Sequence, residues 1–303
     1  MHLTRNERGF VTLGTEQVHA ATHASDLPTM TLSFRLKRYW TTMLDWVYPG
    51  GAVVCALCNR AIPDVSQRQR TQISAWADVP ESLGQLICPF CLQEARDIRP
   101  RPIRRHMKVS VPTREQTGKS RVVQIPVYSV FRYEGFVQRA IRPWKYDGAL
   151  GMTEWFSEGL LSTMAGIHLS NQADGIVPVP TTPERLRQRG YHHTLLLAKS
   201  VAAASHLPVL QLLQRGRQMD SQDERAMTHD VLGRETQTAK SAKERRASLA
   251  GAFATARGVD LTGSRLLLLD DVVTTGATME ACAFQLLAAG ASQVVCLAIA
   301  DVK

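Results

Sequence analysis

Residues 266–278 read LLLLDDVVTTGAT, and this stretch decides the predicted fold class. Four consecutive leucines without polar alternation are typical of a strand that is buried on both faces of a parallel sheet. Ligands bind such sheets beyond the carboxyl ends of the strands, and Asp270 and Asp271 lie at that end. A capped helix after a buried strand would explain Thr278 but not two adjacent carboxylates. The stretch therefore predicts a ligand site.

The small and hydroxylated residues after the aspartates predict a turn into a helix with outward-pointing backbone N–H groups. Such a turn, with the helix dipole behind it, binds phosphate. Carboxylates facing the phosphate would repel it, so Asp270 and Asp271 are predicted to hold hydroxyl groups or Mg²⁺. A ribose 5-phosphate offers both a phosphate and a pair of hydroxyl groups within this span. The predicted phosphate-binding residues are Thr274, Thr275, Gly276, Ala277 and Thr278.

The rest of the C-terminal half alternates between apolar strand patterns and helical periodicity. This alternation predicts an α/β fold with a parallel sheet flanked by helices. The predicted strands are 124–135, 175–180, 208–213, 266–269 and 293–300, and the predicted helices are 136–145, 184–206 and 278–289.

The bulk composition is that of a globular protein: 303 residues, 44% hydrophobic and 21% charged. This length predicts one large domain or two smaller ones. No stretch approaches the roughly 18 apolar residues of a membrane span. The N-terminal residues also lack the apolar core of a secretory signal, so a cytoplasmic protein is expected.

Residues 96–121 carry nine Lys or Arg side chains and two acidic ones, which gives a net +7 of the chain's +9. One interpretation is a contact with nucleic acid or another polyanion. The other is a solvated basic linker, because the segment also contains Pro100, Pro102 and Pro112. Composition alone leaves both open.

Four of the six cysteines are arranged as two CxxC pairs. In a reducing compartment this spacing indicates a tetrahedral zinc site, and four thiolates leave no open coordination position, so the zinc would be structural. The pairs are separated by 29 residues, more than the usual roughly 15–20, and four unmetallated thiols are the alternative. The predicted zinc ligands are Cys55, Cys58, Cys88 and Cys91.

Several motifs together resemble known families. Hydrophobic-Asp-Asp-x-x-Thr-Thr-Gly-x-Thr, complete in DDVVTTGAT, resembles the phosphoribosyl pyrophosphate (PRPP) motif of type I phosphoribosyltransferases. A second resemblance, to the ComF/GntX family, covers about residues 43–303. It rests on the cysteine pairs, on VPVPTTPERLRQRGYHH (177–193) and on three further segments. Those segments are YPGGAVVCALC (48–58), FRYEGFVQRAIRPWKYDG (131–148) and QTAKSAKERRASLAGAF (237–253).

The resemblance implies a binding role for each motif. The aspartates would contact the ribose hydroxyls with Mg²⁺, residues 274–278 the 5′-phosphate, and the loop after the 175–180 strand the pyrophosphate. A solvated basic helix face is the alternative for the two arginines beyond that loop. The implied pyrophosphate-binding residues are Pro178, Val179, Pro180, Thr181, Thr182, Arg185 and Arg189.

Four positions depart from the family pattern, of which Tyr191 in place of Phe is a mild change. His192 and His193 stand where RGFNQ has Asn-Gln, and Ser248 replaces the Asn before GAF. Contacts made through the two amides are therefore in question. A metal role for the histidines is disfavoured, because adjacent side chains on a helix diverge.

The resemblance also divides the chain and suggests its role. The predicted parts are an extension (1–42) with a helix from about 31, a zinc-ribbon module (43–95), a basic linker (96–123) and a phosphoribosyltransferase-like domain (124–303). Residues 218–246 would form a lid over the site. The implied activity is pentosyl transfer from PRPP by a glycosyltransferase, with no certain catalytic residue, linked to DNA uptake and competence or to nucleotide salvage. The alternative is a non-catalytic PRPP or nucleotide sensor, or an adapter that contacts single-stranded DNA or DNA-uptake proteins through residues 96–121.

Overall fold

A computed structural model describes residues 3–5, 11–13, 54–62, 81–84, 86–112, 119–169, 172–215, 252–256 and 258–303. The helix expected from residue 31, the lid expected over 218–246, and Ser248 lie outside these residues. Within the described ranges, no helix is both long and apolar enough to cross a membrane.

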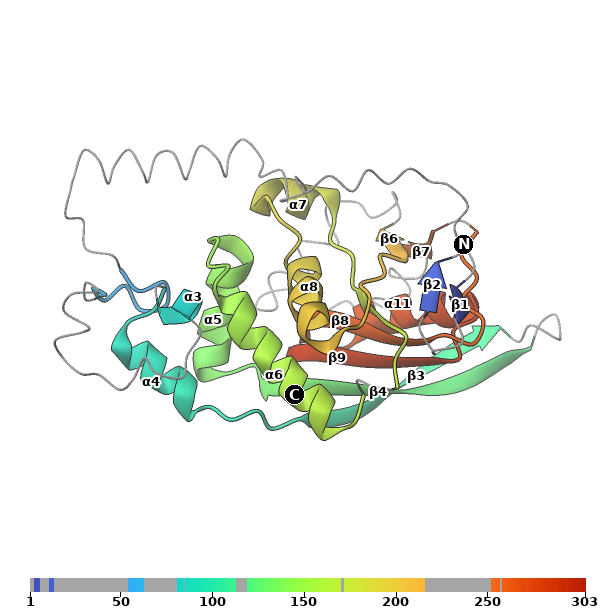
Figure 1. Ribbon diagram of the computed structural model, residues 1–303, viewed down its shortest axis with the longest axis horizontal. Coiled ribbons are helices and arrows are strands. Elements are labelled where there is room, and N and C mark those ends of the chain that lie inside the picture. Colours follow the sequence, from blue (N-terminus) through green and yellow to red (C-terminus); the bar gives the residue numbers. More distant parts are fainter. Residues whose placement is uncertain are drawn as a thin grey trace, which may run out of the picture.

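The centre of the fold is a five-stranded sheet (Figure 1). Its strand order is β3-β4-β9-β8-β5. Strands β4, β9, β8 and β5 are parallel, and β3 pairs antiparallel with β4 at the edge. The predicted α/β class with a mostly parallel sheet is confirmed. The strand bounds are β3 Ile103–Pro112, β4 Ser120–Arg132, β9 Gln293–Asp301, β8 Arg265–Val273 and β5 Gly175–Pro178.

The leucine run forms β8, with β9 on one side and β5 on the other. None of Leu266, Leu267, Leu268 or Leu269 is more than 1% exposed. Alternate leucines belong to two different clusters of buried side chains. The strand is therefore buried on both faces, as its unbroken apolar sequence predicted.

Helices cover both faces of the sheet. One core cluster contains buried side chains of α5, α6 and α8 together with the cysteine module, and the other contains those of α11. Figure 1 shows α3 and α4, near the cysteine module, beside α5 at one end of the molecule. The helix bounds are α3 Glu81–Gly84, α4 Pro89–Asp97, α5 Gly135–Tyr146, α6 Met152–Gly166, α7 Pro183–Arg189, α8 His193–Ser205 and α11 Ala277–Ala288.

The linker interpretation does not hold for residues 103–112, which form β3. This strand pairs with β4 over its whole length, from Ile103 opposite Ser129 to Pro112 opposite Ser120. Val109 and Val111 turn inward and are buried in the α11 core cluster. Apolar side chains on alternate positions give this basic segment a buried face, which a solvated linker lacks.

Two other predicted elements differ in detail. The helix expected over 184–206 is two helices, α7 and α8, because Gly190 adopts a left-handed conformation (φ +81°) that ends α7. The strand expected over 208–213 is reduced to an isolated bridge between Val209 and Ile176. Two short antiparallel pairs complete the described strands: β1 Leu3–Arg5 with β2 Val11–Leu13, and β6 Leu213–Arg215 with β7 Phe253–Thr255.

Candidate functional site

The carboxyl edge of the sheet brings two predicted loops together. Pro178 of β5 pairs in register with Leu269 of β8, and the Val179 N–H donates to the Leu269 carbonyl at 2.9 Å. The loop implied to bind pyrophosphate therefore lies directly beside the acidic pair. Parallel strands of equal register end at the same edge, which is why motifs about 90 residues apart in the sequence meet.

A cavity of about 870 Å³ opens at this edge. It is lined by both aspartates, by all of residues 274–278, and by Thr181, Arg185 and Arg189. Thr182 is buried instead, and its hydroxyl caps α7 by accepting from the Arg185 N–H at 3.1 Å. Thr182 therefore stabilises the loop conformation at the start of α7, and it is the neighbouring Thr181 that lines the cavity.

The turn after β8 has the geometry expected of a phosphate cradle. Thr274 and Thr275 are exposed, and Gly276 caps α11 in a left-handed conformation (φ +85°) that glycine adopts without strain. The Thr275 hydroxyl accepts from the Ala277 N–H at 3.3 Å. Among the described residues no side chain accepts from the next N–H groups of the first turn, so these remain available to an anion.

Arg105 supports this turn from β3 and was not predicted as a site residue. Its Nη2 donates to the Thr274 carbonyl at 3.3 Å, while its Nε pairs with Asp301 at 3.0 Å. Asp301 lies at the end of β9 and is 1% exposed. One guanidinium thus links the edge strand, the central strand and the turn.

The two adjacent aspartates have different surroundings, and Asp271 is fully engaged. Its Oδ2 is 2.8 Å from the Lys145 ammonium and 2.5 Å from His193 Nε2, and its Oδ1 accepts from the Val272 N–H at 2.5 Å. Burial alone would raise the pKa of Asp271, but the Lys145 charge and the His193 ring hold it well below its usual range. Asp271 is therefore an ionised anchor for α5 and α8.

Asp270 is the carboxylate that remains open to a ligand. Its Oδ1 accepts from the Asp271 N–H at 2.8 Å, and among the described residues it makes no other hydrogen bond and no ion pair. The side chain is partly exposed and lines the cavity. Burial, and then the charge of Asp271, raise the pKa of Asp270. A cation beside it would reverse that effect, so this carboxylate is suited to Mg²⁺ or to hydroxyl donors.

His193 joins Asp271 to Arg189. A guanidinium can only donate, so Arg189 Nη1 donates to His193 Nδ1 at 2.8 Å and the ring proton lies on Nε2, facing Asp271. Burial lowers the pKa of His193 to about 4, which keeps the ring neutral near pH 7. The Arg189 guanidinium also lies 4.5 Å from the centre of the Tyr146 ring, and its Nε is buried without a hydrogen-bond partner.

The replacement of Asn-Gln by His-His thus has a structural account. His192 caps α8, because its Nδ1 accepts from the Leu195 N–H at 3.2 Å, a role that Asn commonly fills. His193 connects the acidic pair to α7 through Arg189. This second role was not predictable from local sequence, because residues 78 positions apart in the chain form the contact.

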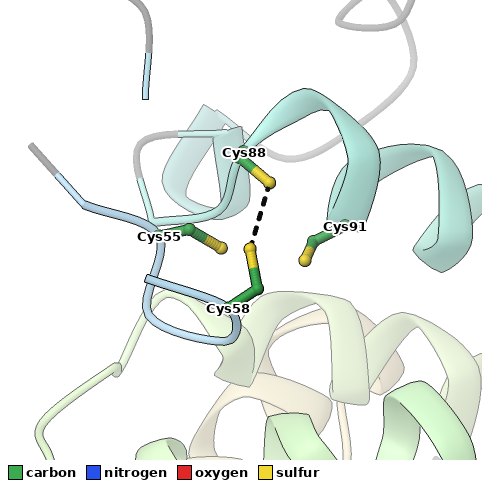
Figure 2. Close-up of side chains that lie close together, drawn as sticks. All are labelled: Cys55, Cys58, Cys88 and Cys91. Atoms are coloured by element: carbon green, nitrogen blue, oxygen red, sulfur yellow. Dashed lines mark hydrogen bonds between the residues drawn. The ribbon is translucent and has the colours of Figure 1, made fainter. Parts of the chain in front are cut away.

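The four paired cysteines converge as their spacing predicted (Figure 2). Their sulfur atoms all lie within 4.8 Å of one another, and the Cys58 and Cys88 sulfurs are 3.5 Å apart. That separation is far too long for a disulfide, at about 2.05 Å. A tetrahedral zinc with Zn–S bonds of about 2.3 Å places its sulfurs about 3.8 Å apart. The donor set therefore fits one ion, with no position left for a substrate.

Local structure preorganises the cysteine cluster. Cys55 and Cys58 belong to a turn closed by a bridge between Val54 and Ala61, and the Leu57 N–H faces the Cys55 sulfur at 3.4 Å. Cys88 and Cys91 lie at the start of α4, which has Pro89 in its first turn. Backbone N–H groups that point at sulfur stabilise thiolates and hence metal binding.

We expect wild-type protein to contain one zinc per chain and the Cys58→Ser variant to contain none, since a neutral hydroxyl is a poor replacement for one of the four thiolate ligands. The variant should unfold about 5 °C lower, corresponding to about 2 kcal/mol for a domain of this size. Elemental analysis and thermal unfolding measure the two effects. Cys282→Ala is the control, because Cys282 is a buried core thiol in α11 outside the cluster. A Cys58→Ser variant that kept its zinc would contradict the assignment.

No family model matches the chain. Among curated proteins it is similar to "Competence protein ComFC" of Bacillus subtilis (strain 168), with 24% identity over 162 residues. The match covers 54% of this chain and 58% of the relative, so the chain spans a little over half the length of the curated relative it matches. The predicted resemblance to the ComF/GntX family is confirmed by this relative.

Two solved structures overlap with less than half of the chain. One is titled "Structure of the allosteric regulatory enzyme of purine biosynthesis", at 21% identity, 42% of this chain, 22% of that chain and a TM-score of 0.27. The other is glutamine phosphoribosylpyrophosphate (PRPP) amidotransferase from B. subtilis complexed with ADP and GMP. It is 19% identical, the overlap covers 43% of this chain and 24% of that chain, and the TM-score is 0.26. Overlaps this limited do not decide the fold, which is given by the strand order and by the position of the acidic pair.

Proposed function

We propose that this ComF-like chain binds PRPP, or a related nucleotide, together with Mg²⁺ at the carboxyl edge of its sheet. The observation that carries the proposal is the cavity that contains both an open carboxylate, Asp270, and the start of α11. There, among the described residues, the first-turn N–H groups beyond Ala277 have no side-chain acceptor. A ribose 5-phosphate presents a hydroxyl pair and a phosphate, which are the groups that these two partners bind. The match of ligand to site is chemical, because each group meets its usual partner.

The two arginines of α7 support a pyrophosphate beside the ribose. Arg185 lines the cavity, and within the described residues it pairs with no acidic side chain. Arg189 offers a buried Nε–H without a partner. Guanidinium groups bind phosphate oxygens through two parallel hydrogen bonds. Arg189 is held by His193 and Tyr146, so it is preorganised for this contact.

The reaction that fits this ligand is pentosyl transfer. A nitrogen nucleophile forms a bond to C1 while the C1–O bond to pyrophosphate breaks, the pyrophosphate leaves with the electron pair, and any proton on the nitrogen passes to water. Mg²⁺ bound at Asp270 would neutralise charge on the departing pyrophosphate. The residues of the chain bind and orient the reactants, and positioning of this kind lowers the barrier without a protein nucleophile.

A non-catalytic role is the second candidate, and the exposed face of β3 favours it. Arg104, His106 and Lys108 alternate outward along this strand, and Arg104 lies 5.7 Å from the centre of the Tyr128 ring. Basic groups beside an aromatic ring suit single-stranded nucleic acid. In this version the cavity senses PRPP or a nucleotide, and the β3 face contacts single-stranded DNA or DNA-uptake proteins in the cytoplasm during competence.

Calorimetry with PRPP and MgCl₂ on the wild-type chain tests the proposal. We expect one site per chain with a dissociation constant in the micromolar range, and much weaker binding when EDTA replaces MgCl₂. Absence of heat and of thermal stabilisation by PRPP·Mg²⁺ would refute it. A pyrophosphate-release assay with nitrogen bases then separates the two versions, because release supports transfer and binding without release supports sensing.

A further inference from the structure

The cavity extends beyond the acidic pair to the cysteine module. Ala56 and Leu57, the two residues inside the first CxxC pair, line it, and so does Tyr133, which directly follows β4. In the sheet, β4 and β5 lie on opposite sides of β8. The Tyr133 side of the cavity is therefore opposite to the side formed by residues 178–182. None of the proposed ribose, phosphate or pyrophosphate contacts uses this module-facing end.

One face of α5 runs along this end of the cavity. Gln138, Arg142 and Lys145 all line it, and their i, i+4, i+7 spacing places them on the same side of the helix. Lys145 contacts Asp271, whereas Gln138 is nearest in sequence to the helix start. A rise of 1.5 Å per residue separates these two residues by about 10 Å. That length accommodates a second ligand group beside the ribose.

The module-facing end has a positive charge that the chain does not neutralise. Lys145 is paired with Asp271, and Arg139 is paired with Glu94 of α4 at 2.5 Å. For Arg142, in contrast, no acidic partner and no hydrogen bond occur in the part of the chain that the structure describes, although it lines the cavity. A guanidinium placed at a cavity wall without a counterion favours a ligand that brings one.

The same end also offers flat and apolar surface. Tyr133 is partly buried, and Leu57 packs against the larger core cluster. Burial raises the pKa of Tyr133, so its hydroxyl stays a neutral donor. An aromatic ring and aliphatic side chains around a few polar groups are typical of sites for planar organic ligands.

We propose that the module-facing end, defined by Leu57, Tyr133, Gln138 and Arg142, binds a planar nitrogen heterocycle that carries an anionic substituent. This proposal rests on the proposed function, for which the heterocycle is the acceptor of the ribosyl group. The apolar walls and Tyr133 hold the ring, and Arg142 binds the anionic substituent. The turn inside the first CxxC pair forms one wall, so the metal module takes part in choosing the acceptor.

Matched pairs of heterocycles test this proposal by calorimetry. Orotate and nicotinate carry a carboxylate, and uracil and nicotinamide are their uncharged counterparts. Each is titrated into the metal-loaded full chain, once alone and once with saturating PRPP·Mg²⁺. We expect at least one carboxylated ring to bind at least about 10-fold more tightly than its uncharged counterpart. Equal affinities within both pairs, or no binding by any of the four, would overturn the proposal.

Arg142→Met locates the charge that reads the carboxylate. The variant should bind the carboxylated ring at least about 10-fold more weakly and keep wild-type affinity for PRPP·Mg²⁺. Arg132→Met is the control, since Arg132 is exposed at the end of β4 and does not line the cavity. Unchanged affinity of Arg142→Met for the ring would refute the assignment. If the carboxylated ring binds but PRPP·Mg²⁺ does not, the proposed function is refuted, whereas the proposed ring-binding subsite is supported.

Discussion

Replacing Asp270 by Asn is expected to weaken PRPP·Mg²⁺ binding by at least about 100-fold, which corresponds to about 2.7 kcal/mol, without lowering stability. Asp270 has one backbone contact and an open oxygen in the cavity. An amide keeps the backbone contact but loses the charge that attracts the cation. Because burial and Asp271 raise the pKa of Asp270, removing its charge also removes an unfavourable interaction.

Calorimetry measures the affinity, and thermal unfolding measures the stability of the same Asp270→Asn preparation. Asp97→Asn is a suitable control, because Asp97 ends α4 and does not line the cavity. An Asp270→Asn protein with wild-type affinity would show that this carboxylate does not hold the ligand. A large loss of stability would instead show that Asp270 is a structural residue.

Replacing Asp271 by Asn should lower the free energy of unfolding by about 3 kcal/mol, the typical cost of breaking a buried ion pair from one side. Lys145 and His193 both reach Asp271 Oδ2, and the three side chains are at most 17% exposed. An amide leaves the ammonium of Lys145 without its counterion. Urea unfolding at pH 7 measures the loss, since the lowered pKa of Asp271 keeps it ionised there.

A double-mutant cycle shows whether the ion pair is the cause. Lys145→Met removes the stranded ammonium, so Asp271→Asn combined with Lys145→Met should be less destabilised than the sum of the two single variants by about 1 kcal/mol or more. Additivity within about 0.3 kcal/mol would contradict the anchor role assigned to Asp271. The two neighbouring aspartates thus serve as controls for each other, one for binding and one for stability.

Local sequence was enough to predict the features that depend on residues close together in the chain. Residues 266–278 form the predicted buried strand and the threonine-glycine turn into a helix, although β8 is longer than predicted and continues through both carboxylates to Val273. The cysteine pairs also converge, because CxxC spacing places two sulfurs on one side of a turn or helix start. These patterns carry their own geometry, and no knowledge of the remaining chain is needed to interpret them.

The unpredicted side-chain contacts of the site join segments that are distant in the sequence. Arg105 reaches Thr274 across 169 residues, and its sequence neighbours gave no sign that this arginine, unlike Arg104, turns inward. Lys145 reaches Asp271 from α5, a separate segment of the chain, and was not predicted as a site residue. The strand at 103–112 was hidden for a different reason. Its prolines and charges dominated the composition, whereas the alternation of Met107, Val109 and Val111 was the informative signal.

The strand order of the sheet has a consequence for how the chain folds during synthesis. β9 follows every other strand of the sheet in the sequence, yet it lies between β4 and β8. Until β9 has been synthesised, the ribosome-bound chain holds β3–β4 and β5–β8 as two halves with no common partner. The turn at residues 274–278 also lacks the Arg105–Asp301 support until then. A ligand therefore meets a complete site only after β9 has left the ribosome. Until then, the nascent chain depends on the β3–β4 and β5–β8 pairings, or on chaperones, to prevent aggregation of the two halves.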